Sequence, residues 1–197
     1  MSQPERKKSK EKKPLKIEIR LSGSGGQGMI LAGVILAEAA AIYEGKNAVQ
    51  TQSYGPEARG GASKSEVIIS DTEILYPKTS RLDYLLALNQ VSCDKYARDL
   101  KDNGLLIVDQ DAVEHLPIVK VVSLPLVRTA REEVGKAVTT NIVSLGALVG
   151  LSGVVSREAL RKAVLSRVPK GTEKLNLKAL KLGFKLADEH QDKVTEL

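Results

Sequence analysis

A run of glycines between an expected strand and an expected helix constrains the fold of this chain more than any other feature. Residues 16–22 (KIEIRLS) alternate apolar and charged side chains, as a strand does, and lead directly into GSGGQG at residues 23–28. The alanine-rich stretch at residues 29–44 is apolar on nearly all sides, which predicts a helix sandwiched in the interior. Gly45 stands where a left-handed residue would end that helix. This order of elements is typical of an α/β fold.

Short apolar runs continue along the chain, and the last third is helical in pattern. Further strands are expected at about residues 48–53, 64–70, 84–89, 105–109 and 119–124. Helices are expected at about residues 91–101, 126–136, 141–151, 157–167 and 175–192, with a turn at 102–104 and Ser156 as the N-cap of the fourth helix in this series. The sequence therefore predicts an α/β fold, a single domain with a central, mostly parallel sheet flanked by helices and a helical C-terminal third.

The net charge of +6 is concentrated at the start of the chain, where residues 1–13 carry six Lys or Arg against two Glu. We expect residues 1–14 to form a disordered basic arm ahead of one domain at residues 15–197. With one Phe and no Trp, the domain lacks the stacking platforms of single-strand binders, so no nucleic-acid partner is expected.

Membrane and redox classes are also constrained by composition. The longest apolar stretch, residues 29–43, contains Glu38 and is shorter than the roughly 20 residues a membrane span needs, so no membrane association is expected. The single cysteine, Cys93, cannot form an internal disulfide or supply the ligands of an iron–sulfur cluster. The basic start is followed by an expected strand and a glycine turn with no cleavable apolar segment, which favours a cytoplasmic protein.

The glycine turn fits G-x-G-x-x-G after a strand and before a helix, an arrangement that offers amide hydrogens to a phosphate or carboxylate. Met29 and Ile30 stand where a P-loop needs Lys and Ser or Thr, so ATP or GTP hydrolysis is not expected. The second strand ends in QTQS at residues 50–53 and lacks the acidic residue that holds the ribose of NAD. This weakens the interpretation as an NAD-binding site but does not exclude it. The alternative is that these glycines only let the helix pack closely on the sheet.

A second glycine-rich loop, YGPEARGG, follows the second strand. Arg59 precedes Gly60 and Gly61, where its guanidinium has room to grip an anion with two hydrogen bonds. The alternative is an internal salt bridge to Glu57 or a turn stabilised by Tyr54. If the strands before the two loops are parallel neighbours, both loops leave the same edge of the sheet and face one cleft.

Catalytic groups are sparse. His115 falls in an expected loop and His190 in the charged last helix, so both are interpreted as solvated surface residues. Cys93 has no evident partner and is interpreted as a packed small residue. We therefore assign no catalytic and no metal-binding residue, and the chain is typical of an enzyme component whose reactive groups lie on other polypeptides.

Several motifs together resemble the gamma subunit of 2-oxoacid:ferredoxin oxidoreductases. They are GSGGQG at 23–28, QSYGPEARGG at 52–61, LALN at 86–89, NIVSLGAL at 141–148 and NLKALKLGF at 176–184. The resemblance covers about residues 15–184 and leaves out the basic arm. The SYGPE form is more similar to the 2-oxoglutarate, pyruvate and ketoisovalerate branches than to the indolepyruvate branch.

This resemblance implies a complex that decarboxylates a 2-oxoacid such as 2-oxoglutarate on thiamine diphosphate, passes electrons through iron–sulfur clusters to ferredoxin and transfers the acyl group to coenzyme A. Alpha and beta subunits would carry the thiamine diphosphate and Mg²⁺, and a ferredoxin-like delta subunit the clusters. The gamma chain, inactive alone, would pack on them and help to hold coenzyme A.

Carried onto this sequence, the resemblance gives an anion-receiving cleft. It consists of Gly23, Ser24, Gly25, Gly26, Gln27 and Gly28 with Tyr54, Arg59, Gly60 and Gly61. Two alternatives stay open, a freestanding Rossmann-type NAD(P)-dependent oxidoreductase and a purely structural scaffold subunit.

Overall fold

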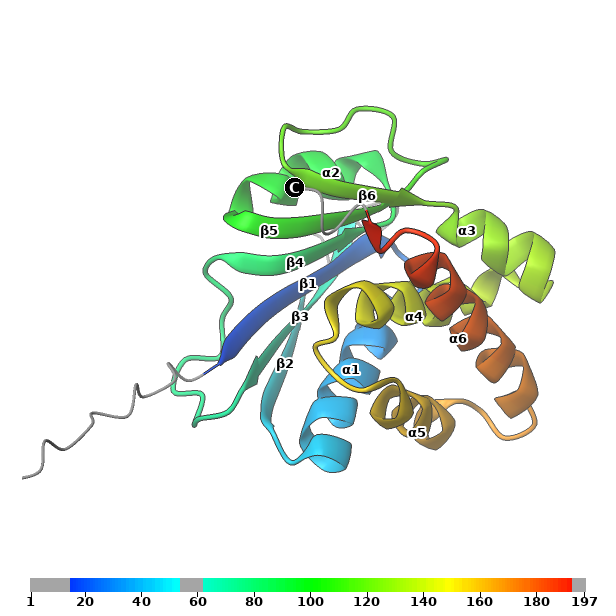
Figure 1. Ribbon diagram of the computed structural model, residues 1–197, viewed down its shortest axis with the longest axis horizontal. Coiled ribbons are helices and arrows are strands. Elements are labelled where there is room, and N and C mark those ends of the chain that lie inside the picture. The colour runs from blue at the N-terminus through cyan, green and yellow to red at the C-terminus, as the bar shows by residue number, and fades with distance from the viewer. Residues whose placement is uncertain (1–14, 54–61, 193–197) are drawn as a thin grey trace, which may run out of the picture.

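One mixed sheet of six strands organises the chain (Figure 1), whose computed structural model describes residues 15–53 and 62–192. The strands lie in the order β2-β3-β1-β4-β5-β6. Their bounds are β1 Lys16–Ser24, β2 Asn47–Ser53, β3 Ala62–Ser70, β4 Leu82–Ala87, β5 Leu100–Asp109 and β6 Lys120–Leu124. Only β3 runs antiparallel to its two neighbours, and the other strands share one direction. The expected mostly parallel sheet is confirmed.

The helices cover the two faces of the sheet unequally. Figure 1 shows α1, α4, α5 and α6 on one side and α2 on the other. Their bounds are α1 Met29–Glu44, α2 Gln90–Tyr96, α4 Thr140–Ser152, α5 Arg157–Arg167 and α6 Glu173–Asp188. Short helical pieces connect β6 to α4, namely α3 at Leu126–Arg128, a π-helix at Thr129–Val134 and a 3₁₀ turn at Ala137–Thr139, and another 3₁₀ turn, Ala97–Asp99, follows α2.

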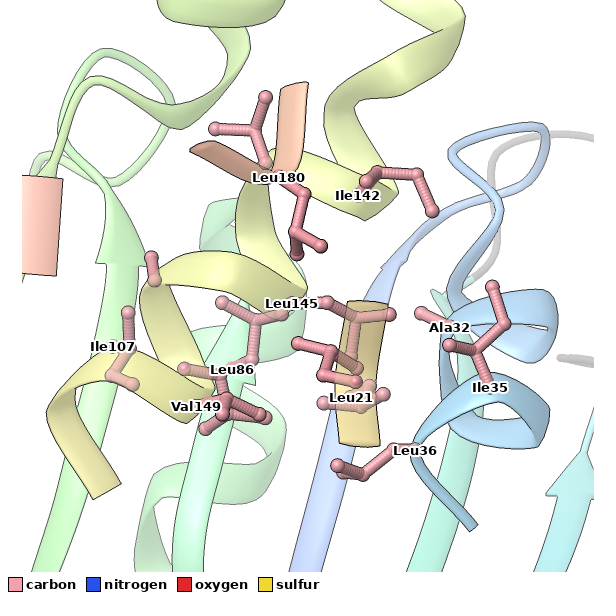
Figure 2. Close-up of a cluster of buried hydrophobic side chains, with 14 of the residues drawn as sticks. Leu21, Ala32, Ile35, Leu36, Leu86, Ile107, Ile142, Leu145, Val149 and Leu180 are labelled. Carbon is pink, nitrogen blue, oxygen red and sulfur yellow. The ribbon is translucent and has the colours of Figure 1, made fainter. Parts of the chain in front are cut away.

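The larger core lies between the sheet and the four-helix side. Figure 2 shows Leu21, Leu86 and Ile107 of the sheet facing Leu145 and Val149 of α4. A smaller cluster lies under α2 on the opposite face of the sheet. Its members are Leu82, Leu85, Ala87, Cys93, Tyr96, Ala97, Leu100, Leu106, Val108 and Val113. Cys93 is fully buried among them, which confirms its interpretation as a packed small residue.

Several local expectations are confirmed. Gly45 ends α1 at φ 66°, in the left-handed region that glycine adopts without a steric penalty. Ser156 caps α5 because its hydroxyl accepts a hydrogen bond from the Ala159 amide at 3.1 Å. Helix α1 is held between the sheet and α5, with Ala32, Ile35 and further side chains fully buried. The arm expected at residues 1–14 lies outside the described residues.

Two expectations for the middle of the chain are wrong. The turn expected at 102–104 lies inside β5, where the register against β4 shifts between Leu82 and Tyr84. A Cβ at Gly104 would lie 2.9 Å from the Leu82 carbonyl oxygen, so this glycine marks an irregular strand pairing and not a reversal of the chain. The helix expected over 91–101 ends at Tyr96 and is followed by a 3₁₀ turn. The helix expected over 126–136 is present over 126–134, mostly as a π-helix.

Helices α4 and α6 cross closely because each has a glycine at the crossing. A Cβ on Gly146 of α4 would lie 2.6 Å from the Leu180 carbonyl oxygen and 3.0 Å from the Gly183 Cα of α6. Two of the motifs that carry the resemblance, at 141–148 and 176–184, therefore form the two sides of one helix contact.

Candidate functional site

The carboxyl ends of β1 and β4 form the point at which the connections of the sheet change sides. After β1 the chain enters α1 on one face, and after β4 it enters α2 on the other. In open α/β sheets, ligands bind in the crevice that such a change creates outside the strand ends. Asn89, two residues after β4, links the ends of the two strands, because its Nδ2 donates to the Ser24 hydroxyl of β1 at 2.8 Å. The Asn89 Oδ1 also accepts from the Ser92 amide at 2.8 Å and caps α2.

The glycine turn begins at this crevice and is more compact than the sequence suggests. Gly23 and Ser24 are the last residues of β1, so only residues 25–28 leave the sheet. The Gln27 side chain folds back, and its Oε1 accepts from the Ser24 amide at 2.7 Å. Gly25 and Gly26 are exposed, and a Cβ on either would meet no heavy atom of the described residues within 4 Å. The surface of the turn that faces solvent therefore consists of bare backbone.

Helix α1 starts directly behind this turn. Its N-cap is Gly28, at φ 74°, and no side chain caps the helix and no acidic residue lies in its first turn. The Gly28 carbonyl accepts from the Ala32 amide at 3.0 Å, which is the first hydrogen bond of the helix. The amides of a first helical turn have no partner within the helix and carry a partial positive charge. The turn and the helix end together can receive an anion.

Asn141 supports the turn from α4 and was not among the predicted site residues. It is 5% exposed, and its Nδ2 lies 3.5 Å from the Gly28 carbonyl oxygen. A Cβ at Gly28 would lie 2.7 Å from the same nitrogen, so Gly28 is needed for close packing against α4 and not against the sheet, as the alternative supposed. Asn89 was missed as well. Asn89 ends an apolar stretch and Asn141 begins one, each within a motif that carries the resemblance, and this is the signal that could have identified them.

The second loop starts and ends at the same edge of the sheet. Ser53, at the end of β2, pairs with Lys64, and Ala62, at the start of β3, pairs with Ser24. Strands β1 and β2 run in the same direction, but β3 separates them, so they are not the parallel neighbours that the sequence analysis required. The predicted site residues Tyr54, Arg59, Gly60 and Gly61 lie outside the described residues.

Asp109 and the two histidines are not part of the glycine turn. Asp109, at the end of β5, is fully buried, and burial raises the pKa of its carboxyl. Its Oδ2 accepts from the Val127 amide at 2.7 Å and anchors α3. His115 is exposed in a loop, as expected. His190 lies just beyond α6 and not inside it, with its Nδ1 2.9 Å from the Leu186 carbonyl oxygen.

Residues 15–53 and 62–192 contain neither a candidate metal site nor a candidate membrane span. No group of His, Cys, Asp and Glu side chains there has a geometry that could hold a metal ion. Within the same residues, no helix combines the length and the apolar character that crossing a bilayer requires.

Comparison with known families decides the classification. The family described as pyruvate ferredoxin/flavodoxin oxidoreductase matches residues 18–186. The chain belongs to this family. It is 52% identical to the 2-oxoglutarate synthase subunit KorC of Methanocaldococcus jannaschii, over 92% of this chain and 99% of the relative.

Solved structures agree with the assignment to the family. The gamma subunit of a keto/oxoacid ferredoxin oxidoreductase from Geobacter sulfurreducens is 56% identical, with a TM-score of 0.82 over 88% of this chain and 97% of that one. A 2-oxoglutarate:ferredoxin oxidoreductase from Magnetococcus marinus, solved with 2-oxoglutarate, coenzyme A and succinyl-CoA, shares the fold. Its TM-score is 0.77 at 22% identity, over 88% of this chain and 31% of that one.

These findings confirm the resemblance to gamma subunits of 2-oxoacid:ferredoxin oxidoreductases and the fold expected from it. The chain is a subunit of an oxidoreductase of this class. The alternative of a freestanding NAD(P)-dependent enzyme finds no support among these relatives, which are named as subunits or share only the fold.

Proposed function

We propose that this chain is the gamma subunit of a 2-oxoglutarate:ferredoxin oxidoreductase and that its glycine turn holds part of coenzyme A. The 2-oxoacid is inferred from the KorC relative, which the chain matches over almost its whole length. Alpha and beta subunits with thiamine diphosphate and Mg²⁺, a ferredoxin-like delta subunit with iron–sulfur clusters, and a cytoplasmic location complete the proposal. The reaction then takes place on the partner chains, and this chain binds and orients.

The observation that carries the coenzyme A proposal is the bare backbone of residues 25 and 26 ahead of an uncapped helix. Packing accounts for Gly23, whose Cβ would strike the Gln27 side chain, and for Gly28, whose Cβ would strike Asn141. Nothing within the described residues approaches Gly25 or Gly26 in the same way. A side chain at either position would instead occupy the space in front of the amides, where an anion would have to approach.

Coenzyme A has chemistry that suits this edge of the sheet. It supplies the thiol that accepts the acyl group, and its pyrophosphate and 3′-phosphate are anions of the kind that helix N-termini and arginines bind. We assign the pyrophosphate to the turn at residues 25–28. Arg59 is proposed as a second contact to a phosphate on the basis of its sequence position alone.

A matched pair of glycine variants tests the turn in the assembled complex. Gly26 (φ 89°) and Gly171 (φ 87°) are both exposed, and neither has a heavy atom near its Cβ position. Alanine therefore strains the backbone equally at both sites and costs about 1 kcal/mol or somewhat more at each. Gly26→Ala should raise the KM for coenzyme A about tenfold, equivalent to about 1.4 kcal/mol, and leave the KM for 2-oxoglutarate unchanged.

Gly171→Ala should lower stability to the same extent and leave both KM values unchanged. If both variants leave the KM for coenzyme A unchanged, the turn does not hold that ligand. In that case the structural-scaffold alternative accounts for the chain better.

The Arg59 contact has its own test. Arg59→Ala should raise the KM for coenzyme A by about tenfold in the complex. Arg59→Lys should restore little of the loss, because an ammonium group cannot make the two parallel hydrogen bonds of a guanidinium. An unchanged KM in Arg59→Ala would remove Arg59 from this role without affecting the assignment of the turn.

A further inference from the structure

Positive charge is concentrated in the last two helices. Residues 157–192 carry nine Lys or Arg against five Asp or Glu, whereas residues 15–156 carry fourteen against sixteen. On α6, Lys174, Lys178, Lys181 and Lys185 follow one another at intervals of four, three and four residues, which places them along one side of the helix. At 1.5 Å per residue this row is about 16 Å long.

Two hollows of about 520 and 360 Å³ lie beside this row on α5 and α6. They share Arg157, Lys181 and Phe184, and we call them together the α5–α6 groove. Figure 1 shows both helices on the side of the helical layer away from the sheet. None of the residues that line the groove belongs to the glycine turn or to a strand.

The charges around the groove are unequally satisfied. The Arg157 guanidinium pairs with Asp188, and Arg161 pairs with Glu158 at 2.8 Å. Lys178 and Lys181 are exposed, and the ammonium group of neither forms an ion pair or hydrogen bond with any of the described residues. The groove therefore presents two uncompensated ammonium groups beside apolar side chains, among them Leu177 and Leu182.

The shape of the groove favours an extended polypeptide over a nucleotide. The Arg157 guanidinium lies over the Phe184 ring, 4.8 Å from its centre, so this face of the ring is not available for a base to stack on. Apolar hollows that follow one another along a helix suit the spaced side chains of an amphipathic segment, and a row of lysines beside them suits carboxylates. The basic arm of this chain is excluded as the occupant by its own positive charge.

We propose that the α5–α6 groove docks an acidic, partly apolar segment of another subunit of the complex. Carboxylates of that segment pair with Lys178 and Lys181, and its apolar side chains enter the hollows on either side of Phe184. This proposal rests on the assembly described under the proposed function, and it does not depend on coenzyme A.

Chemical probing of the intact complex tests the occupancy of the groove. Lys178 and Lys181 should be acetylated at least fivefold more slowly in the complex than in the isolated chain, whereas the exposed Lys78, in the β3–β4 loop, should react equally in both. A zero-length carbodiimide joins amines to carboxylates in direct contact. It should link Lys178 or Lys181 to an Asp or Glu of another subunit.

Charge reversal tests the electrostatic part. Lys181→Glu should weaken retention of the other subunits at least tenfold, with the loss shrinking as the NaCl concentration rises, whereas Lys78→Glu, with the same change in net charge, should have no effect. If the complex forms but both lysines react as fast as in the free chain, the groove proposal is wrong and the assembly stands. If the chain purifies from its host without other subunits, the groove proposal and the proposed assembly are both wrong. Specific binding of ATP that Lys181→Glu abolishes, without lysine protection in the complex, would identify a nucleotide site and refute docking.

Discussion

Gly146→Ala is a sharp test of how the helical layer is held together, because sequence and structure predict opposite signs. Glycine inside a helix is less favourable than alanine by up to about 1 kcal/mol, so propensity alone predicts that the variant is more stable. The structure places the new methyl group 2.6 Å from the Leu180 carbonyl oxygen, 3.0 Å from the Gly183 Cα and 3.1 Å from the Phe184 nitrogen.

The size of the effect follows from these distances. All three atoms belong to the backbone of α6, so no change of rotamer can relieve the clash. To bring the methyl and the carbonyl oxygen to an ordinary separation of about 3.4 Å, α6 must retreat by roughly 0.8 Å, and a gap of that size forfeits a quarter to a half of each neighbouring van der Waals contact. Overpacking of this kind costs about 1–3 kcal/mol, and we take the upper half of that range because the obstacle is backbone. After the gain in propensity, a net loss of about 2 kcal/mol is expected.

Chemical and thermal denaturation measure this loss. For a chain of this length, about 2 kcal/mol corresponds to a decrease in Tm of roughly 4–8 °C. Gly25→Ala is the control, because its added methyl meets no heavy atom within 4 Å and its φ is not positive, and its stability should stay within about 0.5 kcal/mol of the original chain. A Gly146→Ala chain as stable as the original, or more so, would refute the argument that these glycines set the distance between α4 and α6.

Three further predictions concern strand β1 and its neighbours. The Arg20 side chain is 7% exposed and donates to the buried Glu66 carboxylate at 2.6 Å. Arg20→Met should therefore lower the free energy of unfolding, measured in urea, by about 3–5 kcal/mol. Arg131→Met, at an exposed ion pair, should lower it by less than about 1 kcal/mol. Burial raises the pKa of the Glu66 carboxyl, but hydrogen bonds from Thr79 and Arg20 outweigh it and hold that pKa below the ordinary 4.5. The resulting stabilisation is complete above the unfolded-state pKa and is lost as the pH falls through the folded-state pKa. Glu66→Gln should therefore make the stability of the chain less dependent on pH in the acid range. The same acid dependence in the variant as in the original chain would contradict this assignment. Asn89→Ala should lose the α2 cap and the hydrogen bond to Ser24, which lowers the free energy of unfolding by about 1–2 kcal/mol. Asn89→Asp should keep the cap but place a carboxylate beside the glycine turn, and it should therefore raise the KM for coenzyme A in steady-state kinetics.

Local chemistry predicted the elements of this fold better than their pairing. Gly45 and Ser156 act within a few residues of themselves, and both were identified as caps from sequence. The antiparallel direction of β3 follows from its short link to β2, because parallel neighbours need a longer crossover. The insertion of β3 between β2 and β1 depends on β1, which lies much earlier in the chain, and no residue within β3 encodes that position. Gly104 was misread for the same reason, because a bulge in β5 and a chain reversal need the same residue type and only the neighbouring Leu82 distinguishes them.

The site shows the same division between local and distant causes. The glycine turn was found from spacing, but Asn141, which packs under it, comes from a helix more than a hundred residues later in the chain. Its role depends on where α4 lies, and α4 is placed in turn by the crossing of Gly146 with Gly183. Sequence reasoning can propose a loop that binds, but it cannot supply the distant residues that hold the loop in shape.

The glycines of the turn differ in what requires them, and this difference connects the structure to function. At Gly23 and Gly28 a side chain would collide with Gln27 or Asn141, so folding alone explains the residue type there. At Gly26 the positive φ favours glycine but no described residue crowds it, and at Gly25 nothing within residues 15–53 and 62–192 demands a glycine. A glycine that these residues do not require, at the switch point of an α/β sheet and ahead of an uncapped helix, is explained by something that approaches the turn closely. Gly25→Ala should therefore be nearly neutral for stability and harmful for coenzyme A binding, and equal stability with an unchanged KM would show that nothing approaches that closely.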